Sequence, residues 1–291
     1  MLINNMVLKK KGSGEIMQHI KKIFIMIVSA FLLMTSITSG IVTIKAQDDV
    51  DQYALMREKF HDMAVGGSYD INDPDVKPML QSINDTAQLY WDNMNKNPIS
   101  NAIKGNYMNA EDTALDPNLD PSNDYIFPEY PLGKRRSGSN AYINANSIQF
   151  TYQYLRAMAL AYETKGCALY KNEDMFESIK MALEFMNEYH YNQEFKQGSK
   201  TVPYGNWFSW RLGAPVYLGE TLLLLYDDLD KETIDKYAAT MAEFVNWTSF
   251  TGANSTWNER VSMYTGLLTE DSSYMSHIQS VMPTVLKYTE Q

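Results

Sequence analysis

The chain has 291 residues, of which 45% are hydrophobic and 12% aromatic, so it can bury a sizeable core and is not a disordered tail. The first 46 residues carry six Lys and one Glu, which leaves 19 basic and 34 acidic residues, a net charge of −15, for the remainder. This acidic balance excludes nucleic acid as a general partner, because phosphate binding needs a basic surface. An anionic ligand in a locally basic cleft stays possible.

The first 46 residues have the layout of a signal peptide. The pair Lys21–Lys22 precedes the apolar run Ile23–Met34, and the small residue Ala46 stands before a polar stretch. We therefore expect a secreted protein. The charge-free segment around the apolar run is also long enough to cross a bilayer, so an uncleaved anchor is the alternative. The residues before Met17 fit neither interpretation, and we expect translation to begin at Met17.

From residue 47 onward the pattern is helical nearly everywhere. Helices are expected over 50–63 and 74–94, the second with Asp73 as its cap and Pro74 in its first turn. Residues 97–139 contain five prolines and break the period, which predicts a long surface loop. Its basic run Lys134–Arg136 is either a solvated charge cluster or the approach path of a polyanion.

The second half carries apolar stripes at helical spacing. Such stripes begin at Ile148, Met175, Ile234, Trp257 and Tyr274. Asn172 and Asp230 are positioned to cap two of the helices, and Pro215 to begin another. The lone cysteine, Cys167, is expected to be a small buried hydrophobe near a helix end. Roughly eight helices without strand alternation predict an all-α fold, either a layered bundle or an α/α toroid.

The stretch Tyr204–Leu225 is the most informative one. Trp207, Phe208 and Trp210 crowd Asn206 and Arg211 beside a Gly-Ala-Pro turn. Aromatic faces bind sugar rings, while Asn and Arg side chains bind hydroxyls and carboxylates. The alternative is that the aromatic residues plug the core under a turn. Three aromatic residues within four positions favour a carbohydrate site.

The runs NANSIQFTYQYLRAMALAYETKG, YGNWFSWRLGAPVYLGETLLLL and TGANSTWNERVSMYTGLLTED, in this order, resemble the N-terminal α-domain of polysaccharide lyase family eight. This family comprises the hyaluronate, chondroitin AC and xanthan lyases. The resemblance covers about residues 140–291. It implies that 47–291 form part of an incomplete α/α toroid, without the family's C-terminal β-sandwich domains. It also implies a monomer that cleaves an acidic polysaccharide by β-elimination at a uronic acid, with no cofactor.

The resemblance also assigns roles to residues of this chain. Asn254, in TGAN, is expected to contact the uronate carboxylate, and Trp207 and Phe208 to stack on sugars. Asn206 matches the Asn before that pair, and Trp247 lies near a further aromatic wall residue. No metal is implied. Two positions depart from the family pattern. The family commonly has Trp at the position of Phe208 and an acidic residue at the position of Arg211, and the second difference favours a more anionic ligand.

The family's general base His and acid Tyr belong to a segment downstream of residue 291. The four histidines of this chain, His19, His61, His190 and His277, lie outside any such motif. We therefore expect either an acidic-polysaccharide lyase or its truncated, inactive N-terminal fragment. The alternatives are a non-catalytic glycan-binding module and a fragment with no folded function. A glycosidase would need two facing carboxylates, and the aromatic stretches offer no such pair.

Overall fold

The structure is a computed structural model, and it describes residues 51–99, 123–132, 145–192, 206–245 and 250–285. The chain divides into two units, 1–50 and 51–291, and every described residue belongs to the second. The predicted signal peptide over 1–46, the start at Met17, the basic run Lys134–Arg136 and Trp247 all lie outside the described residues.

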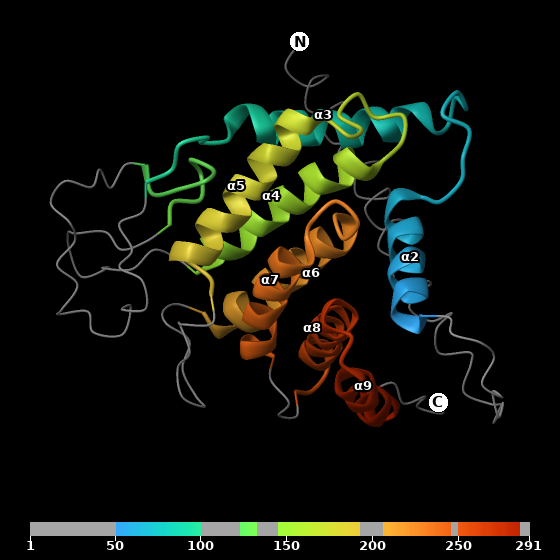
Figure 1. The fold of residues 1–291 in the computed structure, drawn as a ribbon, viewed down its shortest axis with the longest axis vertical. Coiled ribbons are helices and arrows are strands. Elements are labelled where there is room, and N and C mark those ends of the chain that lie inside the picture. Colours follow the sequence, from blue (N-terminus) through green and yellow to red (C-terminus); the bar gives the residue numbers. More distant parts are fainter. Residues whose placement is uncertain (1–50, 100–122, 133–144, 193–205, 246–249, 286–291) are drawn as a thin grey trace, which may run out of the picture. The chain divides into compact units, whose positions relative to one another are not determined.

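Three helical hairpins build most of the second unit. They are α4 (Asn146–Glu163) with α5 (Glu173–Tyr189), α6 (Ala214–Leu224) with α7 (Lys231–Phe244), and α8 (Ala253–Thr269) with α9 (Ser272–Val285). The first members pack in sequence, α4 on α6 and α6 on α8, while α5, α7 and α9 cover their other side (Figure 1). This double layer is an arc of an α/α toroid, and the described residues contain helices but no strand, as predicted.

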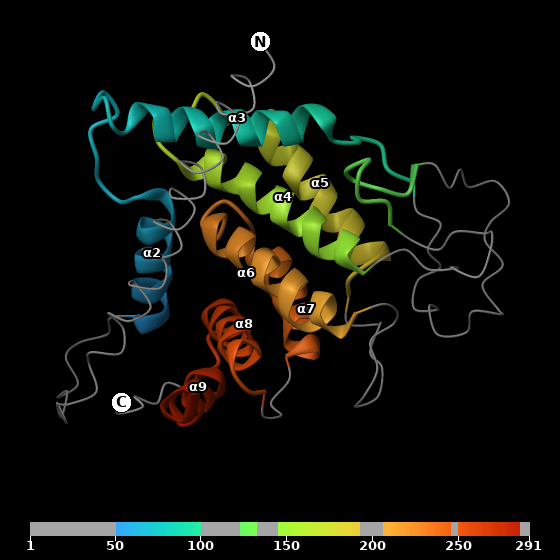
Figure 2. The ribbon, with the colours of Figure 1, turned by 180° about the vertical axis from the view of Figure 1, so that it is seen from behind.

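Two further helices flank the arc. α3 (Lys77–Asn93) crosses over α4, and α2 (Gln52–Val65) contacts α4, α6 and α8 (Figure 2). α2 has no fully buried residue, although several of its apolar side chains, Phe60 among them, pack against the core. Among the described residues, no helix is long and apolar enough to cross a membrane.

Two of the three predicted helix caps are present. The Asn172 side chain accepts a hydrogen bond from the Met175 amide at 2.9 Å, and Asp230 accepts one from Thr233 at 2.8 Å. The third prediction is wrong, because α3 begins at Lys77 with Pro78 in its first turn. Asp73 instead accepts from the Asp75 amide at 2.8 Å, which closes a turn ahead of the helix.

The predicted surface loop over 97–139 is partly a core element. Within its described part, Ile126, Phe127 and Leu132 are buried. The Ile126 carbonyl accepts from the Asn95 amide at 2.8 Å, and the Leu132 amide donates to the Asp124 carbonyl at 2.7 Å. The proline content correctly predicted a non-helical backbone for this described part. The burial of the three apolar residues was not predictable, because they show no helical or strand periodicity.

The predicted Gly-Ala-Pro turn is also wrong, because Gly213, Ala214 and Pro215 are helical. A π-helical segment, η3 (Ser209–Gly213), runs directly into α6. The Ala214 amide donates to the Ser209 carbonyl five residues earlier. Pro215 has no N–H, and its ring would clash with the carbonyl four residues before it, so the wider π-turn relieves an α-helical conflict.

A charged cluster joins the three inner helices. Glu220 of α6 is buried, and its carboxylate binds Arg156 of α4, with Nε 2.8 Å from Oε2, and Arg260 of α8. The Tyr264 hydroxyl donates to the same carboxylate at 3.1 Å. Cys167 is buried as predicted, and burial raises the pKa of its thiol to about 11.

Candidate functional site

Four aromatic side chains gather where η3 and α8 begin. Trp207 stacks on Phe250 with ring centroids 5.3 Å apart and planes 13° from parallel. Phe208 contacts Trp257 at 5.4 Å and Trp207 at 6.2 Å. These four residues are called the aromatic cluster below. Since Trp207 remains 38% exposed, the cluster offers a ring face to solvent.

The N-terminal ends of the inner helices lie together beneath this cluster. Ser209 is buried, and its hydroxyl donates to the Asn146 side chain at the start of α4 at 2.6 Å. A Cβ on Gly213 would lie 2.1 Å from Gln149 Oε1, so a glycine allows η3 to approach α4 closely. These contacts hold the backbone that carries Trp207 and Phe208.

Trp210 does not belong to the site. It is fully buried, packs on Tyr191 and Phe244, and its carbonyl accepts from the Tyr191 hydroxyl at 2.8 Å. The core-plug alternative therefore holds for Trp210, while Trp207, three residues earlier, faces solvent. Trp207 is the first residue of the helical segment, ahead of η3, whereas Trp210 lies inside η3 and packs against Tyr191 and Phe244.

Asn206 and Arg211 flank the aromatic pair along the chain. The Asn206 side chain is exposed and accepts from the Phe208 amide at 3.0 Å, which caps the first turn. Arg211 lies in η3 and is half-buried, and no carboxylate in the described ranges pairs with it. It is thus a cation available to an anion within one helical turn of Phe208.

The TGAN motif forms the start of α8. Gly252 is the N-cap residue with φ +58° and ψ −139°, a conformation that strongly favours glycine. Asn254 follows in the first turn, half-buried, and its side chain makes no hydrogen bond to the described part of the chain. It lies one turn before Trp257. An unengaged amide at the positive end of a 17-residue helix is chemically suited to a carboxylate.

Ring contacts with Phe250 and Trp257 bring Trp207 and Phe208 to the start of α8, the helix whose first turn carries Asn254. Trp257 also joins this site, although its helical spacing predicted an inward core residue. The signal that could have identified it is its place three residues after Asn254, on the same face of the helix. Trp247 lies outside the described residues.

The described histidines lie elsewhere and face carboxylates. His61 Nε2 is 3.2 Å from Glu163, buried His190 is 2.8 Å from buried Asp124, and His277 is 3.4 Å from Glu259. None of these three contacts includes a residue of the aromatic cluster.

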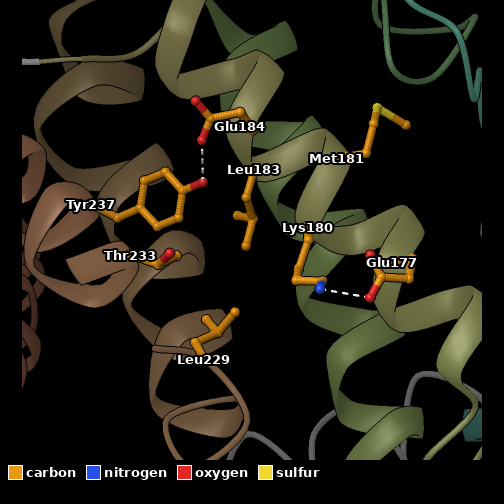
Figure 3. Close-up of a pocket in the computed structure, with 8 residues that line it drawn as sticks. All are labelled: Glu177, Lys180, Met181, Leu183, Glu184, Leu229, Thr233 and Tyr237. Carbon is orange, nitrogen blue, oxygen red and sulfur yellow. Dashed lines mark hydrogen bonds and ion pairs between the residues drawn. The ribbon is translucent and has the colours of Figure 1, made fainter. Parts of the chain in front are cut away.

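A separate groove of ≈ 320 Å³ lies on the outer layer, between α5 and α7. Figure 3 shows the Tyr237 hydroxyl reaching Glu184, and Lys180 paired with Glu177, along its walls. Its lining consists of Glu177, Lys180, Met181, Leu183, Glu184, Leu229, Thr233 and Tyr237. Tyr237 is buried, so this groove presents no aromatic face for a sugar, and no residue of the aromatic cluster lines it.

A two-layered arc of helical hairpins, with aromatic rings at one end of its inner layer, defines an α/α toroid protein. The particular family follows from its sequence. Residues 60–291 match the polysaccharide lyase family 8 N-terminal alpha-helical domain, and the chain belongs to this family.

Individual relatives agree with this assignment. A xanthan lyase of Bacillus sp. (strain GL1) is 28% identical over 223 residues, which is 76% of this chain and 20% of the relative. The polysaccharide lyase 8 family protein HylA of Enterococcus faecalis (strain ATCC 700802 / V583) is 27% identical over 258 residues, 84% of this chain and 16% of the relative. The chain thus spans about a fifth or less of the length of these relatives.

Solved structures share the fold. The Paenibacillus xanthan lyase superposes with a TM-score of 0.65 at 29% identity, over 82% of this chain and 20% of that one. A chondroitin AC lyase of Streptomyces coelicolor A3 superposes with a TM-score of 0.63 at 20% identity, over 83% of this chain and 28% of that one. The predicted toroid is thereby confirmed.

Proposed function

We propose that this chain forms the substrate-binding wall of a lyase that cleaves an acidic polysaccharide by β-elimination at a uronic acid. The observation that carries the proposal is the aromatic cluster with Asn254 one turn away at the start of α8. Rings give a sugar chain a stacking surface, and an amide beside them gives its carboxylate a fixed donor. The relatives named as xanthan and hyaluronate lyases support the same substrate class.

Asn254 has a specific task in this reaction. Removal of the proton next to the uronate carboxylate leaves negative charge that spreads onto the carboxylate oxygens. A donor already aimed at those oxygens stabilises this charge more than it stabilises the bound ground state. The N-terminus of α8 adds its dipole with the same sign. Arg211 supplies a second, full positive charge, which suits a polymer with more than one anionic group.

We further propose that the protein is secreted. The pair Lys21–Lys22 followed by the apolar run Ile23–Met34 supports export, and a polysaccharide substrate is found outside the cell. N-terminal sequencing of the mature protein tests this proposal. A mature chain that begins near residue 47 is expected, whereas a chain that retains the apolar run would contradict cleavage.

Oligosaccharide binding to the full chain tests the stacking surface. Trp207→Ala should weaken the affinity for hyaluronan or chondroitin oligosaccharides by about 1–3 kcal/mol, the magnitude of stacking on one aromatic ring. Titration calorimetry measures the loss. Tyr170→Ala is a matched control, because Tyr170 is 36% exposed and lies in the α4–α5 connection. Equal affinities of wild type and Trp207→Ala would contradict the stacking role.

The second candidate function is a glycan-binding module without catalysis, favoured by the contacts of His61, His190 and His277 with carboxylates outside the aromatic cluster. Ultraviolet absorbance of unsaturated uronides separates the two functions. The test incubates the protein with hyaluronan, chondroitin sulphate or xanthan. Turnover that is lost in Asn254→Ala supports the lyase. Binding without any absorbance change still supports the substrate-binding wall if it depends on the uronate carboxylate, whereas binding that is indifferent to the carboxylate supports the module.

A further inference from the structure

A second polar cluster lies inside the molecule, on the face of α8 that meets α9. Asn258, Glu259 and Ser262 are 1%, 3% and 0% exposed. Asn258 Oδ1, Glu259 Oε2 and Ser262 Oγ are buried and have no hydrogen-bond partner in the part of the chain that the structure describes. Buried oxygens of this kind are costly unless something else satisfies them.

The three residues are neighbours on the helix. Ser262 follows Asn258 by four positions and Glu259 by three, the two spacings that bring side chains together on one helical face. Asn258 Nδ2 donates to Glu259 Oε1 at 3.1 Å, which joins the other two directly. The two nitrogen atoms near the Glu259 carboxylate, Asn258 Nδ2 and His277 Nε2 at 3.4 Å, therefore both lie at Oε1. The other carboxylate oxygen, Oε2, has no donor among the described residues, like Asn258 Oδ1 and Ser262 Oγ.

The Glu259 carboxylate differs in its charged partners from the other two buried glutamates that the structure describes. Glu163 and Glu220 are also buried, but Glu163 is paired with Lys171, and Glu220 with Arg156 and Arg260. Glu259 has no Lys or Arg partner in the described ranges, and the His277 ring, 3.4 Å from Oε1, carries a charge only when it is protonated. Beside a neutral ring, a buried water would satisfy the hydrogen bonds of the cluster but would leave the carboxylate charge without compensation.

We infer that Asn258, Glu259 and Ser262 bind a single alkali-metal cation, with Na⁺ as the probe. An amide oxygen, a carboxylate oxygen and a hydroxyl are the ligands that hard cations prefer. The described residues contain no group of three His, Cys, Asp or Glu side chains, so a softer metal has no matching set here. One carboxylate balances one positive charge, whereas a divalent ion would leave a buried excess.

Thermal unfolding of the full chain tests the site. The melting temperature should rise with NaCl and reach a plateau, and it should rise less in tetramethylammonium chloride at the same ionic strength, because binding to the folded state alone stabilises it. Glu259→Gln should abolish the difference between the two salts. Thr151→Ala is the matched control, since Thr151 is a hydroxyl residue equally buried on α4 rather than on α8, and it should keep the difference.

Two results would overturn the inference. One is equal melting temperatures in the two salts, which assigns the cluster to buried water. The other is a sodium-specific rise in Glu259→Gln as large as in wild type. If Glu259→Gln does not fold, Ser262→Ala takes its place, and the sodium-23 linewidth of the wild-type solution reports bound Na⁺ without any variant. An unbroadened line contradicts the site.

Discussion

Three positions separate two tryptophans with opposite roles. Trp207 is partly exposed in the aromatic cluster, and Trp210 is enclosed by Tyr191 and Phe244. Both stand in the same aromatic stretch, so residue type alone cannot assign them. Their contacts decide the matter, with Phe250 for Trp207 and with Tyr191 and Phe244 for Trp210. Stability measurements should therefore distinguish the two residues clearly.

Trp210→Ala is expected to lower the free energy of unfolding by about 3–5 kcal/mol, because it removes a buried aromatic ring and leaves a cavity. Trp207→Ala should change this free energy by less than about 1.5 kcal/mol, since much of its ring is already in water. Urea denaturation followed by circular dichroism measures both. A large loss of stability in Trp207→Ala would place that ring in the core instead.

Asn254→Ala should weaken binding of uronate-containing oligosaccharides by about 1.5–3 kcal/mol, the usual contribution of a hydrogen bond to a charged group. Oligosaccharides whose carboxylates have been reduced to alcohols should bind both proteins nearly equally, because the charged acceptor is gone. Asn93→Ala, at the exposed end of α3, is the control. An equal loss of affinity for the reduced oligosaccharide would show that Asn254 does not bind the carboxylate.

At the scale of elements, glycines set how closely the inner helices approach. A Cβ at Gly219 of α6 would lie 2.8 Å from Met241 Cε and 2.9 Å from Tyr264 Cβ. At Gly213, the nearest atom would be Gln149 Oε1, the mobile end of a half-buried side chain. The first conflict involves an atom next to the α8 backbone, so α6 and α8 would have to separate.

Gly219→Ala should therefore destabilise the fold by about 1–3 kcal/mol through overpacking. Gly213→Ala should cost less, because all three atoms nearest to its Cβ belong to the Gln149 side chain, which can rotate away. The gain of about 0.5–1 kcal/mol in helix propensity is common to both changes. Thermal or urea unfolding of the two variants, measured in parallel, gives the comparison. The reverse order would mean that the η3 contact with α4 is the tighter one.

The regular elements were predictable because local chemistry determines them. The stripe from Ile148 to Tyr162 and the caps Asn172 and Asp230 depend on neighbours within a few residues. The π-helix was not predictable from the sequence. A proline such as Pro215 indicates the first turn of a helix, and no local pattern shows that the residues before it are already helical. The burial of Ile126 and Phe127 depends on α3 and α4, which no local pattern reports.

The candidate site divides in the same way. Trp207, Phe208 and Asn254 stand in recognisable motifs, so the sequence alone nominates them, and their roles stay predictions. The stacking of Trp207 on Phe250 joins residues 43 positions apart. That contact, and the entry of Trp257 into the cluster, required the packing of η3 against α8. The cation cluster gave no sequence signal, because Asn, Glu and Ser on a helix ordinarily face water.

At the scale of the whole described unit, one charged network joins four segments. It lies at the C-terminal ends of α4 and α6, whereas the aromatic cluster lies where η3 and α8 begin. Lys171 Nζ lies 2.7 Å from Glu163 Oε1 and 2.6 Å from Asp228 Oδ2, and His61 of α2 reaches Glu163 as well. It therefore links α2, the end of α4, the α4–α5 connection and the segment between α6 and α7. Lys171 also lies over the Tyr162 ring, 4.6 Å from its centroid.

The carboxylates of this network titrate in opposite senses. Burial, together with the hydrogen bond to Asp228, raises the pKa of Glu163 above its ordinary value. Burial acts in the same direction on Asp228, but hydrogen bonds with Glu163 and Lys171 outweigh it and leave the Asp228 pKa lowered. The Asp228 contribution to stability is therefore present above its unfolded pKa of about 3.9 and is lost as the pH falls through the lower folded value. The contribution of Glu163 is present below about pH 4.3 and is lost as the pH rises through its folded value.

Lys171→Met removes the one ammonium that both carboxylates share, which raises both of their pKa values. At pH 7 the variant should be less stable by about 1–2 kcal/mol, below the 3–5 kcal/mol of a fully buried pair, because the Lys171 side chain is 36% exposed and screened by water. This deficit should shrink as the pH falls toward 4, because Glu163, whose pKa is raised, takes up a proton and no longer needs the ammonium. Asp228, whose pKa is lowered, keeps its charge and its share of the deficit over this range. Urea unfolding from pH 7 to pH 4 measures it, with exposed Lys165→Met as the control. A deficit independent of pH would show that Lys171 does not stabilise the unit through Glu163.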